Sequence, residues 1–239
     1  MEFCNLKAQY EEYRTELDAA MGEVLRTAAY VGGPAVGELE KELTAFTGSN
    51  AIACANGTDA LYLALMAAGV KPGDEVITTP FTFIATAEMV ALYGAVAKFA
   101  DIRDADFNMD PAKLEQAITA RTTAVLPVSL YGQPADMDAL AAVVEAAAKK
   151  YGHPIALIED AAQSFGAMYK GKRSCNLSPI ASTSFFPAKP LGCYGDGGAV
   201  FARDPEVADR LRLPRHRCRI RFLARLPTSR RSSSPIACI

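Results

Sequence analysis

Apolar residues recur along the chain with two different spacings, and these spacings predict an ordered series of helices and strands. Apolar positions at helical spacing predict one helix over residues 6–29 and a second over about 35–47. From residue 51 onward, short apolar runs that predict strands alternate with helical stretches. The predicted strands are 51–55, 75–79, 96–100, 123–129 and 155–158, and the predicted helices among them are 60–68, 82–93, 110–119 and 136–151. This alternation is typical of an α/β protein with a mostly parallel sheet flanked by helices, in which ligands bind at the carboxyl ends of the strands.

Residues 182–198 contain one lysine, Lys189, between a hydroxyl-bearing apolar run and a cluster of glycines. A lysine that acts as a nucleophile has to be held partly out of water so that its neutral amine is accessible. Ser184, five residues earlier, adds a hydroxyl to the same stretch. On this stretch alone, an ordinary loop lysine is the simpler interpretation.

Residues 56–59 lead from a predicted strand into a predicted helix. The N-terminus of a helix offers free amides and a partial positive charge, which suit a phosphate group. Gly57 allows close approach of the backbone, and Thr58 adds a hydroxyl. A plain helix cap would explain the same residue types, because Asn, Thr and Asp all cap helices well.

Asp160 and Gln163 follow directly after the last predicted strand. A carboxylate at that position can keep a ring nitrogen protonated, because an opposite charge favours the charged form. A local role, in which Asp160 caps the next turn, is the alternative. Phe83 can supply a flat face for a ring, or it can pack in the core. Phosphate donors, a carboxylate and an amine are together the groups that a pyridoxal phosphate enzyme needs.

Several ordered segments resemble the DegT/DnrJ/EryC1/StrS family of pyridoxal phosphate-dependent nucleotide-sugar aminotransferases. The resemblance covers about residues 3–212. The matching segments are 56–61 (NGTDAL), 73–77 (GDEVI), 81–86 (FTFIAT), 159–164 (EDAAQS), 184–192 (SFFPAKPLG) and 195–198 (GDGG).

The resemblance implies a fold and a role for each candidate residue. The implied fold is the aspartate aminotransferase-like type I fold, with residues 1–212 as an N-terminal segment plus the cofactor-binding large domain. The resemblance implies that Lys189 forms the Schiff base with pyridoxal phosphate and that Asp160 pairs with the pyridine nitrogen. It also implies a hydrogen bond from Gln163 near the phenolic oxygen and stacking by Phe83. Gly57, Thr58 and Ser184 are implied to hold the phosphate.

Segments 127–133 and 169–178 look most like the subgroup that acts on UDP-2-acetamido-2-deoxy-3-oxo-glucuronate. The resemblance therefore implies transamination of a keto sugar nucleotide with glutamate as amino donor, in surface polysaccharide or amino-sugar biosynthesis. It also implies a homodimer. The family continues beyond the point that corresponds to Leu211, with a small C-terminal domain that we expect to be missing here, so we expect this chain to lack normal activity.

Composition and charge exclude several other classes of function. The 239 residues include 27 acidic and 25 basic residues but only two histidines, which argues against a His-based metal site or a Ser-His-Asp triad. The six cysteines form no C-x-x-C pair, and we find neither a signal peptide nor a membrane span, so we expect a cytosolic protein with reduced thiols. The excess of acidic over basic residues in residues 1–212 argues against a nucleic-acid partner.

Residues 213–239 differ in character from the rest of the chain. They contain seven arginines and no acidic residue, and they include a serine-rich run. We expect this segment to be an aberrant, disordered basic tail that results from a frameshift or gene truncation near Arg212. A genuine basic tail is the alternative.

Three other functions compete with the aminotransferase hypothesis. A nicotinamide-binding domain is disfavoured because no G-x-G-x-x-G follows the first strands. Deoxysugar dehydration within the same family uses a histidine in place of the lysine, and Lys189 argues against it. A truncated paralogue that binds the cofactor without turnover stays open at this point.

Overall fold

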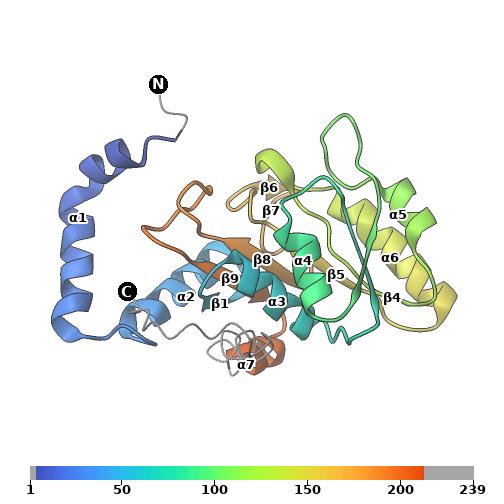
Figure 1. The fold of residues 1–239 in the computed structure, drawn as a ribbon, viewed down its shortest axis with the longest axis horizontal. Coiled ribbons are helices and arrows are strands. Elements are labelled where there is room, and N and C mark those ends of the chain that lie inside the picture. The colour runs from blue at the N-terminus through green and yellow to red at the C-terminus, as the bar shows by residue number, and fades with distance from the viewer. Residues whose placement is uncertain (1–3, 213–239) are drawn as a thin grey trace, which may run out of the picture.

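Seven strands form one mixed sheet at the centre of the protein (Figure 1). The structure, a computed structural model, describes residues 4–212. The strand order is β1-β9-β8-β5-β4-β2-β3. Every neighbouring pair from β8 to β3 is parallel, whereas β9 is antiparallel to both β1 and β8. The mostly parallel sheet predicted from the sequence is therefore confirmed.

The strands of this sheet are β1 (Asn50–Cys54), β2 (Glu75–Thr78), β3 (Val96–Phe99), β4 (Thr122–Val125), β5 (Ala156–Asp160), β8 (Ile180–Ser184) and β9 (Gly198–Ala202). A separate two-stranded hairpin consists of β6 (Met168–Tyr169) and β7 (Lys172–Arg173). The helices are α1 (Leu6–Thr27), α2 (Pro34–Thr47), α3 (Gly57–Ala67), α4 (Ala85–Leu92), α5 (Pro111–Ala117), η1 (Leu130–Gly132, a 3-10 turn), α6 (Met137–Tyr151) and α7 (Pro205–Arg212).

Helices cover both faces of the sheet, and alternate strand residues pack against them. On one face, Val76, Ile158 and Val200 pack in a core shared with α3, α4 and α7. On the other face, Ile77 packs with α5 and α6, and Phe201 packs with α2. Because consecutive residues such as Val76 and Ile77 enter different cores, both faces of β2 are buried, as its wholly apolar centre requires.

Helix α1 forms where the sequence predicts it but stands away from the sheet (Figure 1). None of its residues is buried, although it carries the expected apolar positions. Its contact with the body includes an edge-to-face pair of Tyr10 with Tyr194, whose ring centroids lie 6.2 Å apart. Within the described part of the chain, no helix is long and apolar enough to cross a bilayer.

The main differences from the predicted elements lie at the strand ends. β4 ends at Val125 rather than at residue 129, because a proline at 127 has no N–H to continue the ladder. β8 and β9 were not predicted, since polar residues fill the end of β8. α3 begins three residues earlier than expected, at Gly57. The predicted aberrant tail, residues 213–239, lies outside the described residues.

Candidate active site

The predicted phosphate loop lies where β1 passes into α3. Gly57 and Thr58 are the first two residues of α3, so their backbone belongs to the open N-terminal turn. Asn56 caps this turn, and its Oδ1 accepts a hydrogen bond from Asp59 N at 2.7 Å. The capping interpretation is therefore correct for Asn56, and it leaves the amide end of the helix available to an anion.

Ser184, the last residue of β8, lies directly against this helix end. A β-carbon on Gly57 would lie 2.5 Å from the Ser184 Cβ and 2.9 Å from its Oγ. The Ser184 Oγ also accepts a hydrogen bond from Phe186 N at 3.2 Å. Only a glycine allows this approach, which brings a hydroxyl beside the first amides of α3.

Asp160 is the last residue of β5 and is almost completely buried. Its Oδ2 accepts from Thr86 Oγ1 at 3.1 Å, and its Oδ1 accepts from Ala162 N at 3.1 Å. Burial raises the pKa of the Asp160 carboxyl above its ordinary value, while these two hydrogen bonds and the charge of Lys189 oppose the rise. The bond to Ala162 is the local turn that the alternative interpretation expected, and the carboxylate serves that turn while facing Thr86.

Lys189 lies in the loop that joins β8 to β9. Its backbone N donates to Phe186 O at 2.8 Å, and its side chain is half-buried. Among residues 4–212 the Lys189 ammonium has no ion pair or side-chain hydrogen bond, yet its charge acts on the Asp160 carboxyl. The amine thus acts on the carboxylate through its charge without forming an ion pair with it.

Phe83 and Gln163 border a hollow of about 210 Å³. Its walls are formed by Pro80, Phe81, Thr82, Phe83, Leu130, Tyr131 and Gln163. The Phe83 side chain is 68% exposed, so the hypothesis that it packs in the core is wrong. Gln163 Oε1 accepts a hydrogen bond from Tyr131 N at 3.1 Å. The side-chain amide NH2 of Gln163, which can donate two hydrogen bonds, therefore faces away from Tyr131 N.

Several residues at this site were missed by the sequence analysis. Thr86 holds Asp160, and Thr82 Oγ1 lies 3.2 Å from Thr86 Oγ1. Their spacing of four residues is the available signal, because it places two side chains on the same face of the helix predicted over 82–93. In the structure α4 begins at Ala85, and Thr82 precedes it. Phe81 and Phe107 also form an exposed aromatic group with Tyr131, with centroids 5.6 Å to 6.5 Å apart. No pattern in the sequence linked Phe107 to that group.

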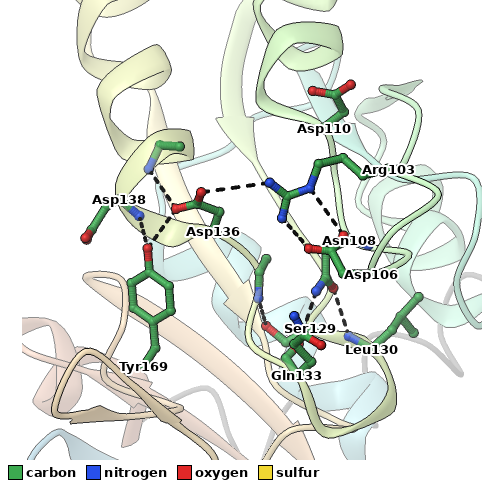
Figure 2. Close-up of polar contacts among 12 residues, drawn as sticks. Arg103, Asp106, Asn108, Asp110, Ser129, Leu130, Gln133, Asp136, Asp138 and Tyr169 are labelled. Carbon is green, nitrogen blue, oxygen red and sulfur yellow. Dashed lines mark hydrogen bonds and ion pairs between the residues drawn. The ribbon is translucent and has the colours of Figure 1, made fainter.

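A second hollow, of about 350 Å³, lies beside Arg103 and contains none of the predicted site residues. Figure 2 shows that its charges are paired with one another: Arg103 contacts Asp106 and Asp136, and Tyr169 donates to Asp136 at 2.7 Å. Within residues 4–212 no group of three or more side chains is arranged to hold a metal ion. We therefore interpret this cluster as structural.

The same network supports the candidate site through Asn108 (Figure 2). Asn108 is fully buried; its Oδ1 accepts from Leu130 N at 3.1 Å, and its Nδ2 donates to Gln133 O at 3.3 Å. These bonds hold both ends of the η1 turn, whose middle residue, Tyr131, binds Gln163. Asn108 thereby fixes the position of a site residue that it does not touch.

Comparisons with known proteins identify the family of this chain. The DegT/DnrJ/EryC1/StrS aminotransferase family model matches residues 11–223. The UDP-2-acetamido-2-deoxy-3-oxo-D-glucuronate aminotransferase of Pseudomonas aeruginosa is 57% identical over 218 residues, which are 90% of this chain and 59% of that protein. The chain thus spans less than two thirds of the length of this relative.

Solved structures give the same result. The structure of S. venezuelae DesV in complex with a ketimine intermediate superposes with a TM-score of 0.84, at 46% identity, over 90% of this chain and 56% of that one. Bacillus subtilis NtdA, with bound cofactor PMP, gives a TM-score of 0.76 at 34% identity, over 84% of this chain and 44% of that one. The fold is that of the type I pyridoxal phosphate-dependent transferases. On both sequence and structure, the chain belongs to the DegT/DnrJ/EryC1/StrS aminotransferase family.

Proposed function

We propose that this chain is the cofactor-binding large domain of an aminotransferase that acts on a keto sugar nucleotide. The observation that carries the proposal is the convergence of three strand ends. The carboxyl ends of β1, β5 and β8 bring a helix N-terminus, a buried carboxylate and Lys189 to one end of the sheet. Among residues 4–212 this lysine has no ion-pair partner. These are the groups that a pyridoxal phosphate site requires.

The residues present fit this cofactor. A β-carbon would fill the space between Gly57 and Ser184, so a small residue is needed where the phosphate would lie, with Thr58 beside it. Asp160 would pair with the ring nitrogen, because its buried carboxylate stabilises a neighbouring positive charge. When bound, pyridoxal phosphate supplies a ring that accepts the electrons left behind as a proton leaves the amino-bearing carbon.

The remaining roles follow from position. Gln163 would donate to the phenolic oxygen with the amino group that faces away from Tyr131. Phe83 would cover one face of the ring, for which its exposed position leaves it available. Lys189 would move the proton, since its amine has no ion-pair partner among residues 4–212 and its charge reaches Asp160.

The substrate is inferred from the Pseudomonas aeruginosa relative. At 57% identity, the activity of that relative supports a UDP-linked 3-keto sugar as the acceptor here. We propose glutamate as the amino donor, a homodimer as the working form, and surface polysaccharide or amino-sugar biosynthesis as the setting. No disulfide joins the cysteines of residues 4–212. We propose a cytosolic location, in which thiols stay reduced.

A cofactor-binding chain without turnover is the second candidate. It shares every site residue with the first, so a turnover measurement has to distinguish the two candidates. We also propose that residues 213–239 arise from a change of reading frame near Arg212. Re-sequencing of the coding DNA tests this: an intact alternative frame that continues the domain is expected, and its absence would refute the idea.

The test of function begins with cofactor attachment. The full chain is incubated with pyridoxal phosphate, reduced with borohydride, digested and analysed by mass spectrometry. We expect a pyridoxyl adduct on Lys189, retained in the control Lys113→Ala and lost in Lys189→Ala. An adduct spread over surface lysines, or none, would overturn the proposal.

Turnover is then measured separately. Glutamate is added to the loaded chain, and 2-oxoglutarate release and the change in cofactor absorbance are followed, with the keto sugar nucleotide added last. Amino transfer to the sugar supports the enzyme. A specific Lys189 adduct without 2-oxoglutarate release supports the cofactor-binding chain.

A further inference from the structure

Two hydroxyl groups, linked by hydrogen bonds, connect the hollow beside Phe83 with the buried carboxylate of Asp160. Thr86 is 2% exposed, and its Oγ1 lies 3.1 Å from Asp160 Oδ2. Thr82, which lines the hollow, places its Oγ1 3.2 Å from the same Thr86 oxygen. The two threonines and the carboxylate thus form a continuous relay from the hollow into the core.

The chemistry of the groups fixes the direction of this relay. An ionised carboxylate only accepts hydrogen bonds, and a hydroxyl carries a single hydrogen to donate. When Asp160 is ionised, Thr86 therefore donates to Asp160, and Thr82 donates to Thr86. Removal of the Thr86 hydroxyl would leave Oδ2 without this donor at a buried position, where an unsatisfied charged group is costly.

Few other groups act on the Asp160 charge. The Ala162 N–H holds Oδ1, and Lys189 acts from the β8–β9 loop. Two further titratable groups lie nearby, Glu159 on the same strand and Cys175, and the Asp160 charge affects both. Thr86 is thus the side-chain hydrogen-bond donor to this carboxylate among the described residues. Thr86 also lies in the first turn of α4, whose partial positive charge favours an anion.

We propose that Thr86, itself held by Thr82, is a positioning residue that fixes the rotation of the Asp160 carboxylate and favours its charged form. In catalysis this role rests on the proposed function, because it matters there only if Asp160 faces a ring nitrogen. Its effect on Asp160 itself does not depend on any cofactor.

Ser182 provides a matched control. It lies in register with Asp160 on the neighbouring strand and is 1% exposed. Its Oγ has no hydrogen-bond partner among the described residues. Ser182→Ala therefore removes a buried hydroxyl next to Asp160 without removing a hydrogen bond to it.

The decisive experiment is the titration of Asp160 in the full chain without cofactor. Aspartate carboxyl carbons are labelled with ¹³C, and the Asp160 signal is assigned by its loss in Asp160→Asn. We expect Thr86→Val to raise the pKa of Asp160 by about one to two pH units, the size of a hydrogen bond to a charged group. Thr86→Ser should restore the wild-type titration, and Ser182→Ala should leave it unchanged.

Cofactor affinity is a second readout. Absorbance titration with pyridoxal phosphate should show binding about tenfold weaker in Thr86→Val, with unchanged stoichiometry and wild-type affinity in Thr86→Ser. If the wild-type chain does not bind pyridoxal phosphate, the proposed function fails, while the Asp160 titration still decides the role of Thr86. The role is refuted if Thr86→Val is folded by circular dichroism and titrates like the wild type. If Thr86→Val does not fold, Thr82→Val decides: a raised pKa of Asp160 supports the relay, and an unchanged one overturns it.

Discussion

The backbone of Gly198 lies so close to Asn56 that a β-carbon on Gly198 would be 2.4 Å from the Asn56 carbonyl oxygen. Gly198 begins β9, the antiparallel strand of the sheet, and Asn56 caps α3. The start of β9 therefore packs directly on the turn that opens the candidate phosphate site.

This contact predicts that Gly198→Ala destabilises the fold and displaces the α3 cap. We expect a loss of about 1–3 kcal/mol, typical of an overpacked buried position, measured by urea denaturation. Gly37→Ala is the control, because nothing lies within 4 Å of a β-carbon there. Gly37 lies inside α2, so alanine should stabilise by about 0.5–1 kcal/mol. Equal stabilities for the two variants would contradict the predicted clash.

Gly57→Ala tests the phosphate site itself. The new methyl group would meet Ser184, so we expect weaker binding of pyridoxal phosphate in an absorbance titration. Ser184→Gly removes the side chain that the new methyl group would meet. The double variant Gly57→Ala, Ser184→Gly should therefore lose less binding free energy than the sum of the two single variants, because the two sites are in contact. Strict additivity would show that the clash is not what weakens binding.

The buried carboxyl of Glu159 should make the stability of the fold depend on pH. Burial raises the pKa of Glu159 to about 7, against hydrogen bonds from Cys175 N and Leu177 N, each 3.1 Å long. The unfolded chain loses this proton at a lower pH than the folded chain does. Stability from this group is therefore complete below the ordinary glutamate pKa and is lost as pH rises through about 7.

Glu159→Gln makes that dependence measurable. The amide can accept only one of the two backbone hydrogen bonds, so we expect a loss of about 1–3 kcal/mol at about pH 5. The difference from the wild type should shrink toward about pH 8, because the glutamine does not titrate. Chemical denaturation at each pH gives the comparison, with exposed Glu88→Gln as control. A constant difference across this range would show that Glu159 does not titrate there.

Phe83→Ala separates binding from folding. Phe83 is 68% exposed, so its loss should change the unfolding free energy by less than about 0.5 kcal/mol. Pyridoxal phosphate should bind about two- to tenfold more weakly, the value of one aromatic contact. Leu25→Ala, at 67% exposure on α1, is the matched control and should leave affinity unchanged. If Phe83→Ala binds pyridoxal phosphate with unaltered affinity, Phe83 does not contact the cofactor.

The sequence predicts much of this fold because most strands are short apolar runs between periodic helices. It fails at β8, where Ser182, Thr183 and Ser184 look like a loop yet are buried by pairing with β5 and β9. Hydroxyl side chains give no local sign that the backbone is central in a sheet. The antiparallel direction of β9 is likewise a property of pairing between distant segments.

The candidate site divides in the same way. Gly57, Asp160 and Lys189 stand out because their residue types suit phosphate, a ring nitrogen and an aldehyde. Thr86 could not be linked to Asp160, since 74 residues separate them and only the tertiary fold brings the start of α4 to the end of β5. Asn108 acts through η1 in a way that no short motif records.

The hairpin that joins β8 to β9 sets how Lys189 can move. Its legs are bonded from Phe185 N to Gly197 O and from Cys193 N to Phe185 O, each at 2.8 Å. Within it, a β-carbon on Gly192 would be 2.3 Å from Pro187 O, so the tip is folded tightly on itself. A tether this short anchors the α-carbon of the lysine, so any movement of the amine has to come from rotation along its flexible aliphatic stem.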